Sequence, residues 1–196
     1  MIAIVDYGAG NLTSVKKAFD SLGAEAVVTD QPETVSAADK VVFPGVGHFS
    51  SLRALERVGM GQVLRQAASG GKPLLGICLG MQWLFEGSEE CDELPGAAIF
   101  SGKCRHFPSS VKSPHVGWNS LRVQDSTRLL RGVGQESFVY YTHSFYAPLV
   151  PTTSAASEYG VQFTAAVEQG NIFGVQFHPE KSGEVGLTIL KNFCEG

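Results

Sequence analysis

The stretch Gly76-Ile77-Cys78-Leu79-Gly80-Met81-Gln82 follows the apolar residues 73–75 and leads into a helical pattern. In this Gly-x-Cys-x-Gly pattern, cysteine replaces the serine of a nucleophile elbow, a sharp turn between a strand and a helix. The elbow holds its central residue in strained backbone, and the small neighbours let the turn close. Cys78 is therefore a candidate nucleophile at the top of a sheet. A buried, inert cysteine beside two turn glycines is the alternative, and this stretch alone leaves both open.

The sequence before the elbow alternates between short apolar runs and helical patterns. Apolar runs at 2–5, 27–28, 41–43 and 74–78 predict strands, whereas helices are expected at 12–22, around Val35 and at 51–69. Gly-Gly-Lys-Pro at 70–73 ends the last of these helices. This alternation predicts an α/β fold with a mostly parallel central sheet that helices cover on both faces.

After residue 96 the pattern changes to short aromatic and β-branched segments that turns separate. These segments are FSGKCRHF (100–107), HVGWNSLRV (115–123), SFVYYTHSFYA (137–147), VQFTAAVEQ (161–169) and IFGVQFHPE (172–180). They predict an antiparallel or mixed extension of the sheet. An amphipathic helix is expected at 183–194. Since no repeat, linker or low-complexity tract is visible, we expect one domain that spans residues 1–196.

Composition excludes several classes of protein. The 196 residues are 43% hydrophobic and 17% charged with a net charge of −4, so the chain lacks the basic surface that nucleic acids or anionic membranes attract. It has no apolar stretch of membrane-spanning length and no signal-peptide pattern, which predicts a cytoplasmic protein. Four cysteines at 78, 91, 104 and 194 form no C-x-x-C pair and have no histidine at ligand spacing. We therefore expect no disulfide framework and no metal site.

A candidate base lies near the end of the chain, in the segment FGVQFHPEKS at 173–182. His178 closes an apolar run and is followed by Pro179 and Glu180. If this strand lies beside the strand that ends at Cys78, both side chains emerge at one sheet edge, where open α/β sheets bind ligands. A thiol nucleophile needs a base such as imidazole, and the base needs an orienting acceptor such as Glu180. The alternative is an ordinary solvated strand end.

A third element is FPGVGHF at 43–49, in which Gly45, Val46 and Gly47 follow an apolar strand. The two glycines allow unusual backbone angles and close approach to a ligand. Backbone N–H groups here and at Leu79 are candidates to stabilise a tetrahedral oxyanion. A plain strand-terminating turn is the alternative.

Elbow, glycine strand and His-Pro-Glu occur here in the order of the class I glutamine amidotransferases, which the chain resembles over nearly its whole length. The segments DYGAGN (6–11), PHVGWN (114–119) and THSFY (142–146) resemble the branch of that family that works in histidine biosynthesis. This resemblance implies a flavodoxin-like fold, glutaminase activity and no cofactor. It also implies a heterodimer with a cyclase subunit, a separate (β/α)8 barrel that receives the ammonia.

The resemblance also implies residue roles. It implies a nucleophile at Cys78, a base at His178 and an orienting carboxylate at Glu180. Residues that resemble the glutamine-binding positions of the family are Gln82, Glu90, His143, Ser144 and Phe145. Residues that resemble the interface with the cyclase subunit are Asn11, Trp118, Tyr140 and Lys181. The segment 45–47 resembles the strand thought to rearrange when the partner's ligand binds, which implies allosteric activation.

Two positions depart from the family pattern: His48 stands where a small residue often follows Pro-Gly-Val-Gly, and Phe145 replaces a more usual tyrosine. Two other functions remain to be weighed. A free-standing cysteine hydrolase on the same sheet, such as a peptidase-like or γ-glutamyl hydrolase enzyme, predicts high activity from the isolated chain. A non-enzymatic assembly module predicts no thiol reactivity.

Overall fold

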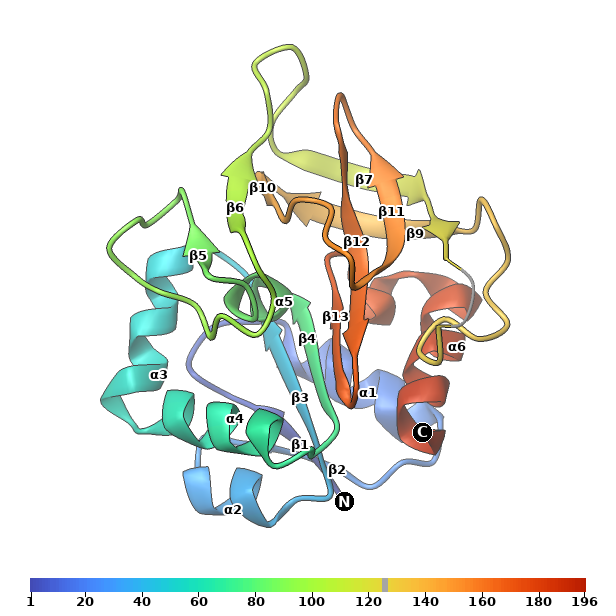
Figure 1. The fold of residues 1–196 in the computed structure, drawn as a ribbon. Coiled ribbons are helices and arrows are strands. Elements are labelled where there is room, and N and C mark those ends of the chain that lie inside the picture. The colour runs from blue at the N-terminus through green and yellow to red at the C-terminus, as the bar shows by residue number, and fades with distance from the viewer. Residues whose placement is uncertain (125–126) are drawn as a thin grey trace.

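The strand that leads into the elbow, β4 (Leu74–Cys78), lies in the middle of an eight-stranded sheet in the computed structural model, which describes residues 1–124 and 127–196. The strand order is β2-β1-β3-β4-β13-β12-β11-β8 (Figure 1). Five neighbouring strands run parallel: β2 (Ala26–Thr29), β1 (Ile2–Val5), β3 (Lys40–Gly45), β4 and β13 (Ile172–Val175). The predicted parallel sheet is confirmed.

Helices cover both faces of this parallel region, as the alternation predicted (Figure 1). The helices α1 (Leu12–Ser21) and α6 (Gly183–Glu195) pack on one face, where Ile4 and Ile77 point. On the other face, which carries Val5 and Phe43, lie α2 (Pro32–Ala37), α3 (Arg53–Arg57), α4 (Met60–Ser69) and α5 (Leu79–Trp83). Because both faces are buried, the strands are continuous apolar runs. No helix in the described part of the chain combines the length and apolar character needed to cross a bilayer.

The predicted helix over 51–69 is wrong as a single element. The structure has a 3₁₀ turn, η1 (Phe49–Leu52), then α3, and α4 begins only at Met60. Gly59 separates α3 from α4 with a φ of 72°. A left-handed residue ends a helix because it turns the chain away from the helical path, and glycine adopts it without a Cβ penalty.

The later segments extend the main sheet only in part. The strands β12 (Gln162–Gln169), β11 (Thr153–Glu158) and β8 (Arg122–Val123) continue it in antiparallel fashion. The ribbon of β7 (His115–Ser120) and β9 (Phe138–His143) is a separate antiparallel sheet. A third sheet contains β5 (Gly87–Ser88), β6 (Lys103–His106) and β10 (Phe145–Tyr146). The sequence did not indicate β11, because its Thr-Ser-Ala-Ala-Ser-Glu residues include only one β-branched residue and no aromatic one.

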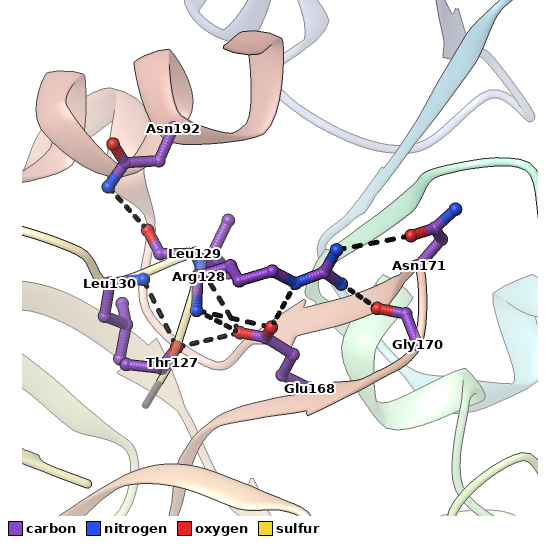
Figure 2. Close-up of polar contacts among 8 residues, drawn as sticks. All are labelled: Thr127, Arg128, Leu129, Leu130, Glu168, Gly170, Asn171 and Asn192. Carbon is purple, nitrogen blue, oxygen red and sulfur yellow. Dashed lines mark hydrogen bonds and ion pairs between the residues drawn. The ribbon is translucent and has the colours of Figure 1, made fainter. Parts of the chain in front are cut away.

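A carboxylate at the end of β12 anchors the segment that follows the undescribed residues (Figure 2). Glu168 accepts hydrogen bonds from the Thr127 hydroxyl at 2.8 Å and the Leu129 backbone N–H at 3.2 Å, and it pairs with Arg128 Nε at 2.9 Å. Asn192 of α6 donates to the Leu129 carbonyl at 2.9 Å. These bonds tie the segment 127–130 to both the sheet and the last helix.

Candidate active site

Cys78 has the strained backbone that the elbow pattern predicts. Its φ is 54° and its ψ is −108°, and α5 begins at the next residue. A side chain at Gly76 would meet the Gly80 carbonyl oxygen at 2.7 Å, and one at Gly80 would collide with the Phe43 carbonyl. Both positions therefore need glycine so that α5 can pack directly on β3 and β4. Only 5% of the surface of Cys78 is exposed, but the residue lines a cavity.

His178 reaches the same sheet edge because β13 pairs in parallel with β4, with Val175 opposite Ile77. The histidine lies three residues beyond the strand end, just before the short turn η2 (Pro179–Lys181). Its Nδ1 lies 2.9 Å from Glu180 Oε1, and both side chains are at most 3% exposed. Its other nitrogen, Nε2, has no hydrogen-bond partner among the described residues.

Burial by itself lowers the pKa of His178, but the neighbouring Cys78 and Glu180 outweigh it and raise the pKa above its ordinary value. A charged imidazole is thus favoured when the sulfur or the carboxylate beside it is negative. His178 is therefore suited to accept a proton from the Cys78 thiol, while its hydrogen bond to the Glu180 carboxylate fixes the orientation of the ring.

A cavity of about 260 Å³ opens in front of Cys78. Its lining comprises Gly47, Cys78, Leu79, Gln82, Glu90, Pro114, Thr142, His143, Ser144 and Phe145. All five residues expected to hold glutamine therefore lie at one cavity, although they come from two distant parts of the sequence, 82–90 and 143–145. Pro114 and Thr142 were not singled out from the sequence, yet each begins a segment that carried the family resemblance. The volume suits a ligand of amino-acid size.

The two glycines at the end of β3 and just after it, Gly45 and Gly47, have different structural roles. Gly45 lies within the strand, and a side chain there would collide with the Tyr7 hydroxyl and meet Leu79 Cβ at 2.9 Å. Gly47 has a φ of 96° and lines the cavity. Unusual backbone angles are therefore confirmed at Gly47, whereas Gly45 is needed for close packing. Val46 lies between them and does not line the cavity.

The two departures from the family pattern have local structural roles. His48 begins η1, where its Nδ1 accepts from the Ser50 backbone N–H at 3.1 Å. Phe145 contributes its carbonyl oxygen, which accepts hydrogen bonds from Gln82 at 2.9 Å and His143 at 2.8 Å. The backbone group does not depend on whether the side chain is phenylalanine or tyrosine. Glu90 is held by the Phe49 backbone N–H, which donates to its Oε2 at 2.7 Å.

The four residues expected at a subunit interface lie away from the cavity lining. Trp118 of β7 is opposite Tyr140 of β9, and their ring centroids are 6.0 Å apart. The Lys181 ammonium lies 5.8 Å from the centre of the Tyr140 ring. Asn11 caps α1, where its side chain accepts from the Ser14 backbone N–H. Trp118, Tyr140 and Lys181 thus form one cluster, and Asn11 stands at the start of a helix that contacts η2.

Besides Pro114 and Thr142, sequence reasoning missed two residues that hydrogen-bond to side chains of this site. Gln176 lies between β13 and His178 and donates to Cys78 Sγ at 3.6 Å. His115 bonds through Nδ1 to His143 Nε2 at 3.0 Å. Both occur in segments that carried the resemblance, but nothing in the local pattern tells a contacting side chain from a packing one.

A cysteine on a strand-to-helix elbow, faced by a histidine–glutamate pair at the edge of a mostly parallel sheet, is the arrangement of a glutamine-hydrolysing amidotransferase domain. The sequence model of the family "Glutamine amidotransferase class-I" matches residues 3–195. The chain therefore belongs to the class I glutamine amidotransferase family.

Three relatives that share one name match this chain over nearly its whole length. The chain is 48% identical to "Imidazole glycerol phosphate synthase subunit HisH" of Bacillus cereus strain G9842, over 98% of this chain and 93% of that protein. It is 45% identical to the protein of the same name from Moorella thermoacetica, over 99% and 94% of the two chains. The protein of that name from Methanothermobacter thermautotrophicus is 46% identical, over 100% and 98%.

Solved structures share the fold. A crystal structure of a glutamine amidotransferase superposes with a TM-score of 0.78 at 18% identity, over 100% of both chains. The structure of PurLQS from Thermotoga maritima gives a TM-score of 0.76 at 19% identity, over 99% of this chain and 97% of that chain. At this level of identity the likeness concerns the fold alone.

Proposed function

We propose that this chain is the glutaminase subunit of an imidazole glycerol phosphate synthase in histidine biosynthesis. It hydrolyses glutamine and delivers the ammonia to a cyclase subunit. That subunit converts N'-[(5'-phosphoribulosyl)formimino]-AICAR ribonucleotide to imidazole glycerol phosphate and AICAR. The observation that carries the proposal is the buried His178–Glu180 pair facing Cys78, at a cavity that Gln82, Glu90 and residues 143–145 line.

The chemistry proceeds in two halves. His178 Nε2 takes the thiol proton while Cys78 Sγ attacks the carboxamide carbon of glutamine, and the same nitrogen returns that proton to the departing ammonia. A thioester remains. Water then attacks its carbonyl carbon, with His178 as base, which releases glutamate and restores the thiol. Glu180 accepts the Nδ1–H of His178, orients the ring and stabilises its positive charge.

The negative oxygen of each tetrahedral intermediate needs backbone donors. The Leu79 N–H is one candidate, because it stands at the start of α5 directly after the nucleophile. A second candidate is a peptide N–H of the segment 45–47, which reaches the cavity at Gly47. The left-handed φ of Gly47 permits a peptide flip that aims or withdraws this donor. Ligand binding in the partner can drive the flip only if the partner binds the flipped state more tightly.

Exposed apolar side chains on the outer face of the β7–β9 ribbon support the proposal that a partner subunit binds there. Val116, Trp118 and Phe138 are each 55–57% exposed, although large apolar side chains are normally buried. Val116 and Trp118 are two apart in β7, so they share one face, and Tyr140 lies directly opposite Trp118. We propose that the cyclase (β/α)8 barrel covers this face in a heterodimer and receives ammonia without its release to bulk water. We place the heterodimer in the cytoplasm, without nucleic acid or membrane partners.

Glutaminase turnover under three conditions tests this function. The rate should rise from the isolated chain, to the complex with the cyclase subunit, to the complex with an analogue of the cyclase substrate. Three equal rates would instead favour a free-standing cysteine hydrolase. Absence of turnover together with an unreactive Cys78 would favour a non-enzymatic assembly module.

A further inference from the structure

A buried side-chain amide touches the nucleophile from the side of the sheet. Gln176 is fully buried, and its Nε2 lies 3.6 Å from Cys78 Sγ. Its Oε1 accepts a hydrogen bond from Gln82 Nε2 at 3.1 Å. The two glutamines therefore form a short relay that ends at the reacting sulfur.

The direction of this relay follows from a backbone carbonyl. Gln82 Nε2 lies 2.9 Å from the Phe145 carbonyl oxygen, which can only accept, so the nitrogen end of the Gln82 amide must lie there. The second N–H of Gln82 then meets Gln176 Oε1. Because an amide has its oxygen and nitrogen on opposite sides, Gln176 must present its N–H groups to Cys78.

A buried histidine pair holds the other end of the relay. His143 Nδ1 lies 2.8 Å from the same Phe145 oxygen, so this nitrogen carries a proton and Nε2 accepts from His115 Nδ1. Burial lowers the pKa of His115 to about 4. Burial also lowers the pKa of His143 to about 3, although the hydrogen bond to the Phe145 carbonyl opposes this shift. Both rings are therefore neutral near pH 7, which fits one donor and one acceptor on each.

We infer that Gln176 is a further catalytic residue: its amide N–H donates to Cys78 Sγ and stabilises the thiolate. The inference rests on the proposed function. A thiolate in a buried site needs compensating donors, and hydrogen bonds to a charged group are stronger than neutral ones. A neutral amide supplies such a donor without competing with His178 for the proton, because it does not titrate. Gln82 holds Gln176 in the donating orientation.

Two substitutions test this role in the complex with the cyclase subunit. Gln176→Met keeps an unbranched side chain of similar length but has no N–H, so kcat/KM for glutamine should fall roughly 10- to 100-fold. Gln176→Glu preserves the shape and retains a donor only while its carboxyl is protonated. Its activity relative to wild type should therefore fall further as the pH rises.

Alkylation separates this role from a structural one. The rate at which iodoacetamide modifies Cys78 in the isolated chain should reach its plateau at higher pH in Gln176→Met than in wild type. Thr164→Val serves as the control, since Thr164 is fully buried and hydrogen-bonded in β12 but outside the cavity lining. Its alkylation profile and glutaminase rate should match wild type. Ammonia-dependent synthesis should persist in all three complexes.

An unchanged kcat/KM and an unchanged alkylation profile in Gln176→Met would overturn the inference. So would a loss of activity in Gln176→Glu that is the same at every pH, because that points to packing alone. If the wild-type complex itself releases no glutamate, the proposed function fails instead, and the two failures are thus distinguishable.

Discussion

Gly45 and Cys78 are direct register partners across the parallel strands β3 and β4. The residue that starts the glycine segment therefore stands beside the nucleophile, although 33 positions separate the two in the sequence. We therefore expect a displacement at the end of β3 to change which backbone groups lie near the nucleophile.

Gly45→Ala should lower glutamine hydrolysis by the complex on the order of 10²- to 10³-fold, the effect of losing one oxyanion donor. The new methyl group would collide with the Tyr7 hydroxyl and crowd Leu79, so the segment 45–47 must shift. Steady-state glutaminase rates measure this. Gly134→Ala is the matched control, because a methyl group there makes only an ordinary 3.7 Å contact with Ser137 Oγ. Equal rates for both variants would show that Gly45 is not required.

A glutamine-derived affinity label should modify Cys78 alone among the four cysteines. Burial raises the pKa of Cys104 and Cys194, which keeps both as thiols, and Cys91 is buried away from the cavity. Peptide mass mapping measures the label at each site. Cys78→Ser should lose glutamine-dependent synthesis while ammonium salts still support the cyclase reaction. Labelling of another cysteine at the same speed would contradict the assignment.

His178→Ala should reduce glutaminase turnover of the complex by roughly 10⁴-fold or more, and Glu180→Gln by a smaller factor. In the proposed mechanism the histidine carries the proton, whereas Glu180 only orients and stabilises it through a 2.9 Å contact. Rates of glutamate release for the two variants provide the test. Wild-type turnover in His178→Ala would rule out the triad.

The stability of the chain should fall as the pH drops from about 6.5 toward 4. His115 has a pKa of about 4 in the fold because of burial, but an unfolded histidine takes up its proton near 6.5. Unfolding therefore binds protons in this window, so acid favours the unfolded state. His115→Gln should flatten the slope by up to about 1.4 kcal/mol per pH unit. Urea unfolding at several pH values measures it, and parallel slopes for wild type and variant would refute it.

Trp118→Ala should weaken binding of the cyclase subunit on the order of 10- to 100-fold, because exposed aromatic residues at the centre of an interface carry much of its binding energy. Isothermal titration of the cyclase subunit measures the Kd. The matched control is Leu149→Ala, another exposed apolar residue, which lies outside the β7–β9 ribbon. An unchanged Kd for Trp118→Ala would show that the cyclase subunit binds a different surface of this chain.

The sequence by itself determined the alternation that builds the parallel sheet, the elbow at Cys78 and the amphipathic last helix. These features depend on local causes: apolar periodicity, glycines that a sharp turn requires, and the lengths of the runs. The family resemblance added the residues expected to hold glutamine, and Gln82, Glu90 and residues 143–145 all lie at one cavity. Local pattern failed where one residue changes the path of the chain, as Gly59 does between α3 and α4.

Only the tertiary structure decided which side chains meet. The pairing of β4 with β13 places His178 beside Cys78, and no local pattern states which strands are neighbours. The orientation of Gln176 depends on Gln82 and on the Phe145 carbonyl, from two other parts of the chain. The physical reason is that a hydrogen bond between distant segments depends on atomic positions set by packing, whereas periodicity records only which face of an element is buried.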